Sequence, residues 1–129
     1  MIADITEYSF IADGGFEITG EGTLLIDGDV YTNDFIAKKR DVELTDTKTF
    51  ITKYDLNLDN KGSFTTGEDT NFWARNIKAK SSEADIKGIV NVANDMNLMG
   101  KNSKVKITGQ YIGYGCSTTD DATTNDATI

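Results

Sequence analysis

Three aspartates and one asparagine recur at a nearly constant spacing, and their oxygens could bind a metal ion. Asp34, Asp55, Asn76 and Asp95 are separated by 21, 21 and 19 residues, and each precedes a large apolar residue. On stacked strands about 4.8 Å apart, such oxygens could form a Ca²⁺ ladder. The structural alternative is that Asn and Asp tolerate left-handed backbone and bond their own backbone at turns. No EF-hand or glycine-rich nonapeptide pattern is present, which favours turns and keeps Asp34, Asp55 and Asp95 only as candidates for Ca²⁺. We expect no other cofactor.

Aromatic residues form a second set of candidates, for contact with a partner. Trp73 occupies the position of Tyr31 and Val92 within the repeat, which favours packing in or half in the core over a platform for sugars. The segment QYIGYG near the end of the repeats either closes the last turn or presents an aromatic surface. The candidates for partner binding are Trp73, Tyr111, Ile112 and Tyr114.

No combination of residue types and spacing predicts catalysis. The chain has no histidine, the commonest general base. Paired carboxylates could hydrolyse glycosidic bonds, but with 21 acidic residues in 129 such pairs arise by chance. The repeats also leave no long loops from which to build a cleft. We therefore expect a protein that is not an enzyme.

The overall charge and hydropathy exclude two classes of partner. The net charge of −8 disfavours nucleic acid, because phosphate binding needs a basic surface. No apolar run approaches the length of a membrane-spanning helix. We therefore expect contact with a membrane only through a segment outside this sequence.

The elements that position these residues are short strands, because apolar residues alternate in pairs with a period near twenty. One stripe follows the polar positions at Phe35, Leu56, Ile77 and Met96. Alternating apolar pairs indicate strands with one buried face, and a fixed period indicates a repeat architecture. A second stripe consists of Ile26, Leu44, Phe64, Ile86 and Ile107. The pattern predicts an all-β fold, a single-stranded right-handed parallel β-helix (β-solenoid) of about five coils of about 20 residues.

The domain organisation follows from where this pattern holds. Residues 20–115 carry the coils, and residues 1–19 are expected to form an N-terminal cap or partial coil, with Tyr8, Phe10 and Ile11 covering the open end. Residues 116–129 lack apolar spacing and are expected to be a flexible polar tail. We expect self-association or binding of a protein partner through the coil ends, chiefly the C-terminal end near Tyr111.

Three stretches carry a resemblance to a known family. They are GKNSKVKITGQYIGYG at 100–115, GDVYTND at 28–34 and NVANDMNL at 91–98. They resemble the β-solenoid region of PilX-type pilus-assembly accessory proteins of Gram-positive bacteria and, more loosely, bactofilin-like polymer-forming proteins. The resemblance implies a non-enzymatic structural or assembly module, pilus-associated or adhesin-like, at the bacterial cell surface or outside the cell. It supplies no catalytic residues.

One functional alternative belongs to a different class. A carbohydrate-binding or carbohydrate-active β-helix would use Trp73, the tyrosines and the acidic residues.

Overall fold

Short parallel β-strands make up the regular structure of the computed structural model, and its described residues form no helix. The structure describes residues 10–12, 14–59, 61–67, 69–100, 103–115, 117–119 and 126–128. None of these residues belongs to a helix that could cross a membrane. The strands are β1 (Phe10–Ala12), β2 (Phe16–Thr19), β3 (Thr23–Asp27), β4 (Val30–Thr32), β5 (Phe35–Lys38), β6 (Asp41–Thr45), β7 (Thr49–Asp59), β8 (Ser63–Thr66), β9 (Thr70–Lys80), β10 (Glu83–Val92), β11 (Met96–Met99), β12 (Lys104–Gly113), β13 (Ser117–Thr119) and β14 (Asp126–Thr128).

The strands stack on three sides of a β-solenoid, and every pairing between neighbouring coils is parallel. Side 1 contains β1, β4, the first parts of β7 and β9, and the last parts of β10 and β12. Side 2 contains β2, β5, the last parts of β7 and β9, β11 and β13. Side 3 contains β3, β6, β8, the first parts of β10 and β12, and β14.

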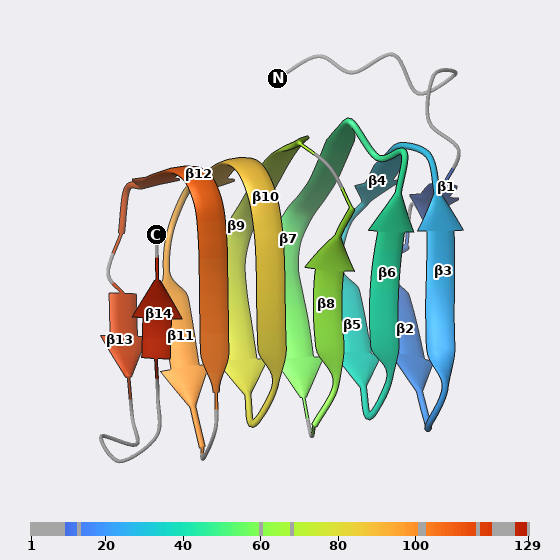
Figure 1. The fold of residues 1–129 in the computed structure, drawn as a ribbon, viewed down its shortest axis with the longest axis horizontal. Helices are drawn as coiled ribbons and strands as arrows, with labels where there is room; N and C mark the ends of the chain where they lie inside the picture. Colours follow the sequence, from blue (N-terminus) through green and yellow to red (C-terminus); the bar gives the residue numbers. More distant parts are fainter. Residues whose placement is uncertain are drawn as a thin grey trace.

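The winding is right-handed, as the sequence predicts. In Figure 1 the near strands of side 3 point upward, the far strands of side 2 point downward, and the chain advances from right to left. Four complete turns lie between Val30 and Ile107, and strands of further turns lie at both ends.

The core consists of columns of inward-facing residues, and each column contains one residue from each coil. Phe35, Leu56, Ile77 and Met96 pair in register on side 2, and each is at most 5% exposed. This column confirms the stripe that the sequence predicts. Where the columns of the three sides meet, aromatic rings pack together: the ring centroid of Phe50 on side 1 lies 5.5 Å from that of Phe35 on side 2 and 5.5 Å from that of Phe64 on side 3. Neighbouring coils therefore bury one another's apolar faces.

One predicted column is wrong by two residues. The sequence pattern places Phe64 in the column of Leu44, whereas the structure pairs Phe64 with Val42 and Ala84. Thr66 takes the place opposite Leu44 and is buried. Its Oγ1 accepts a hydrogen bond of 2.8 Å from the Lys87 backbone N–H, which offsets the cost of burying the hydroxyl.

Strands extend beyond the range predicted for the coils. Phe10 and Ile11 lie in β1, which pairs with β4 and so continues side 1 by one strand. Tyr8 lies outside the described residues. Within 116–129, the range predicted to be a polar tail, β13 pairs with β11 and β14 pairs with β12.

Candidate functional site

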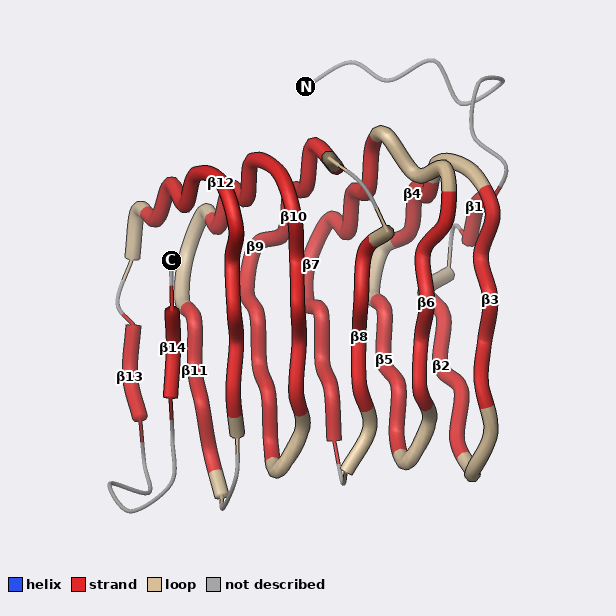
Figure 2. The backbone as a smooth tube through the Cα atoms, viewed as in Figure 1, coloured by secondary structure: helices blue, strands red, loops and turns tan. Residues whose placement is uncertain are grey.

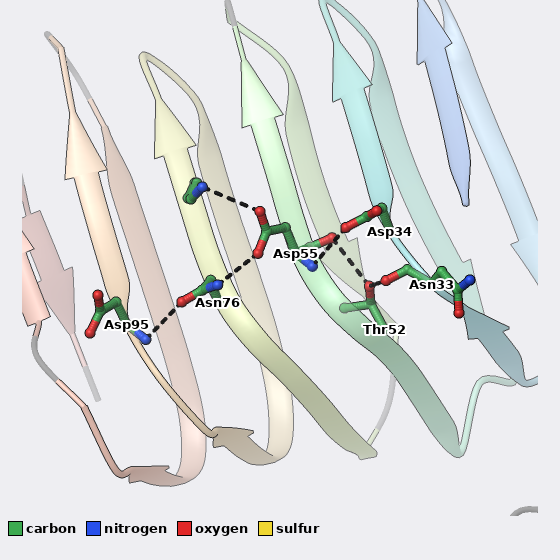
Figure 3. Close-up of polar contacts among 7 residues, drawn as sticks. Asn33, Asp34, Thr52, Asp55, Asn76 and Asp95 are labelled. Carbon is green, nitrogen blue, oxygen red and sulfur yellow. Dashed lines mark hydrogen bonds and ion pairs between the residues drawn. The ribbon is translucent and has the colours of Figure 1, made fainter. Parts of the chain in front are cut away.

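The four polar residues at corner 1–2, where side 1 turns into side 2, form a ladder of hydrogen bonds between coils (Figure 3). The Asp34 carboxylate accepts from the Asp55 backbone N–H at 3.1 Å, and the Asp55 carboxylate accepts from Asn76 Nδ2 at 2.7 Å. Asn76 Oδ1 accepts from the Asp95 backbone N–H at 3.0 Å. The side chains of Asp34, Asp55 and Asn76 thus each bind a neighbouring coil, and Asp95 takes part through its backbone N–H.

The backbone conformation of the ladder bears on the structural interpretation of the polar spacing. Left-handed backbone at non-glycine positions occurs, among the described residues, at Lys39, Asp46, Lys61 and Ser81, and not in the ladder. The expectation of left-handed backbone at the ladder residues is therefore wrong. The described residues also contain no group of three or more His, Cys, Asp or Glu that could hold a metal ion. Asp34, Asp55 and Asp95 carry hydrogen bonds between coils, and Lys78 Nζ adds an ion pair of 3.2 Å to Asp55.

Trp73 lies on the outer surface of side 1, half-buried. It pairs with Ile51 and Asn91, so its predicted alignment with Val92 is wrong, whereas its alignment with Tyr31 through Ile51 is correct. Ile51 faces outward and lies outside the core cluster, yet it is only 4% exposed. The larger neighbours on either side therefore shield it. From β4 to β12 the outward column is Tyr31, Ile51, Trp73, Asn91 and Ile112.

The other candidates for partner binding lie at the C-terminal end of side 1, in or next to β12. Tyr111 is half-buried and packs against the core, which makes it the inward residue of its coil. Ile112 is half-buried in the outward column, and Tyr114 is 74% exposed. The structure therefore places Ile112 and Trp73 in one column, two coils apart, and gives Tyr111 a structural role.

A groove lies at corner 3–1, where side 3 turns into side 1, and we call it the corner groove. It has a volume of about 580 Å³. Its lining consists of Lys48, Asp69, Thr70, Asn71, Gly88, Ile89, Gly109 and Gln110.

The corner groove exists because successive coils cross this corner differently. Residues 46–48 lie between β6 and β7 and belong to no strand, whereas β10 and β12 cross the corner without a break at Gly88 and Gly109. Figure 2 shows the strand colour continuing over the corner in β10 and β12. We call the part of the lining around Lys48 and Asp69 the wall of the groove, and the part around Gly88 and Gly109 its floor.

Glycine is required at both floor positions. Gly88 has φ +129°, and a Cβ there would lie 2.1 Å from the Thr70 carbonyl oxygen. Gly109 has φ +135°, and its Cβ would lie 2.1 Å from the Gly88 carbonyl oxygen. L-residues rarely adopt this backbone, and no side chain fits between the coils. The floor is therefore made of closely packed backbone.

Hydrogen bonds hold the wall of the groove in place. Asp29 Oδ1 accepts from the backbone N–H groups of Lys48 and Thr49 at 2.8 and 3.1 Å. The buried Thr70 Oγ1 donates to the Thr47 carbonyl at 2.7 Å, which joins the start of β9 to the loop before β7.

Sequence reasoning missed this groove. The signal that could have found it is the pair Gly88 and Gly109, 21 residues apart, which pair with each other and with Thr70, the first residue of β9. The side chains of Asn71, Ile89 and Gln110 then follow as the outward residues next to the corner.

The chain matches no protein-family model, no curated protein and no solved structure.

Proposed function

We propose that this protein is a non-enzymatic structural module that is extended at its coil ends, by a second copy or by a protein partner that adds strands. The observation that supports this most is the pairing of the end strands. Within the part of the chain that the structure describes, each of β1, β2 and β3 pairs with one strand only, as do β13 and β14. Unpaired N–H and C=O groups on such edges are templates for further pairing.

Incomplete burial at the ends favours the same function. The inward residues of the central coils are at most 5% exposed. The equivalent residues of the end coils, Phe16, Ile18 and Leu24 at one end and Tyr111 at the other, are only partly buried. An added coil would remove this apolar surface from water.

Charge favours end contacts over contacts between lateral surfaces. The outer surface of side 3 exposes carboxylates such as Glu43 and Glu83, and the chain has a net charge of −8. Like charges oppose lateral clumping of copies. The setting that the sequence resemblance suggests, and that we include in the proposal, is a pilus-associated or adhesin-like scaffold at the bacterial cell surface.

Light scattering across a range of protein concentrations tests the proposal. We expect the mass of the parent to rise with concentration and the Tyr111→Lys/Ile112→Lys variant to stay closer to a monomer. The matched control is Asn57→Lys/Thr65→Lys, which adds the same charge on the outer surfaces of central coils. Circular dichroism verifies that each variant keeps its fold.

Two outcomes would contradict the proposal. One is a parent that remains monomeric at every concentration. The other is an end variant that associates as readily as the control.

A further inference from the structure

We propose that the corner groove, together with the adjacent Trp73 surface, binds a neutral glycan chain. This site is separate from the coil ends and does not depend on the assembly function. Its volume of about 580 Å³ falls within the range of small-molecule sites.

The polar groups of the groove suit ligands rich in hydroxyl groups. The amides of Asn71 and Gln110 are exposed at its lining, and each offers both donors and an acceptor. Lys48 adds donors and Asp69 adds acceptors. A sugar hydroxyl both donates and accepts, so it can be satisfied by any of these four side chains.

The charges of the groove favour a ligand without net charge. Lys48 and Asp69 carry opposite charges, so the lining of the groove sums to zero although the chain carries −8. An anionic polymer would meet Asp69 and the acidic protein, and a cationic one would meet Lys48.

The apolar part of the site suits the C–H faces of sugar rings. Ile89 is 44% exposed at the groove floor, between the positions of Asn71 and Gln110 in the same outward column. Trp73 follows Asn71 by two residues on β9, so both side chains face outward on side 1. An amphipathic ring beside exposed amides gives apolar contact and hydrogen bonding in one surface.

The site runs along the solenoid axis, which favours a chain of sugars over a single sugar. Asn71, Ile89 and Gln110 lie on three successive coils, in register. Neighbouring strands are about 4.8 Å apart, so the column repeats its contacts along the solenoid axis.

Titration of the intrinsic fluorescence tests the proposal, because Trp73 is the only tryptophan of the chain. The probes are hexasaccharides of β-1,4-linked glucose, mannose, xylose and N-acetylglucosamine, with polygalacturonate and an uncharged decapeptide as competing classes. We expect a saturable change in Trp73 emission with at least one neutral hexasaccharide.

Two variants and a matched control sharpen the test. Gln110→Ala removes one hydrogen-bonding side chain and should weaken binding about three- to tenfold. Ile89→Arg fills the groove floor and should abolish binding. The control, Leu25→Arg, makes the same change at an exposed aliphatic residue of β3 on side 3 and should bind as the parent does.

Three results would overturn the proposal. They are no saturable response to any neutral hexasaccharide, a response only to polygalacturonate or the decapeptide, and a loss of binding in Leu25→Arg as large as in Ile89→Arg. Measuring at a protein concentration where light scattering shows a single mass keeps association out of the signal.

Discussion

Corners 1–2 and 3–1 hold the same coils together by different means. At corner 1–2, side chains such as Asp55 and Asn76 make the contacts between coils. At corner 3–1, the later coils approach through backbone alone, at Gly88 and Gly109. The first arrangement fills its corner with polar groups, whereas the second leaves space outside it. The groove therefore arises from an absence of side chains at two positions, Gly88 and Gly109.

The largest effect is expected at the backbone corner. Gly88→Ala places a methyl group 2.1 Å from the Thr70 carbonyl oxygen at a φ of +129°. We expect the free energy of unfolding to fall by at least about 3 kcal/mol. Urea denaturation followed by circular dichroism measures this change. Gly14→Ala is the control, because a Cβ there meets nothing within 4 Å. If Gly88→Ala and Gly14→Ala had equal urea midpoints, close backbone packing at corner 3–1 would not contribute to stability as we expect.

An intermediate effect is expected at the side-chain corner. Asp55→Ala removes the acceptor of Asn76 Nδ2 and the ion-pair partner of Lys78. We expect a loss of about 1–2 kcal/mol in the same denaturation experiment, because a part-buried donor loses its partner. Asp41→Ala is the control: its carboxylate accepts from Ser63 Oγ at 2.8 Å, but at an exposed position. An equal loss of unfolding free energy in Asp41→Ala and Asp55→Ala would contradict a special role for the ladder at corner 1–2.

The smallest effect is expected at corner 2–3, where side 2 turns into side 3. Lys39 directly follows β5 with φ 59°, and the residues in the same place after β2 and β11 are Gly20 and Gly100. Lys39→Gly relieves the strain of the left-handed backbone. It should raise the free energy of unfolding by about 0.5 kcal/mol, and the melting temperature slightly with it. Lys53→Gly, within β7 at a position whose backbone is not left-handed, should lower it. A decrease for Lys39→Gly would show that this corner is not strained.

The apolar spacing was sufficient to predict the solenoid and most of its inward columns. Phe35, Leu56 and Ile77 follow the same polar neighbour in each coil, so the sequence contains their register directly. Phe64 could not be placed correctly from the spacing. The spacing gives the number of residues in each coil, but not the corner at which a longer coil inserts its extra residues. The pattern chose the apolar Phe64 over Thr66, whose burial depends on a backbone donor in the next coil.

The candidate sites were less predictable than the fold. The residue types of Asp55 and Asn76 indicated a turn. Their hydrogen-bond partners could not be predicted, because these depend on how side chains of neighbouring coils are placed. Trp73 could not be assigned to the inner or outer surface, because a one-residue shift in register reverses the facing of a strand. The groove requires knowing that Gly88 and Gly109 lie beside loops of earlier coils, which no single stretch of sequence contains.

The nearly constant separation of paired residues along the chain, 18 in β3–β6 and 22 in the first part of β7–β9, has a consequence for the speed of folding. Gly88 pairs with Gly109, and Leu56 pairs with Ile77, in both cases 21 residues further along the chain. Every new coil therefore closes a loop of the same modest length, and the closure entropy does not grow as the stack lengthens. Folding can begin at any two adjacent coils and advance in both directions. Although its sheets are parallel, the chain never has to bring distant segments together, and its refolding rate should depend little on how many coils follow.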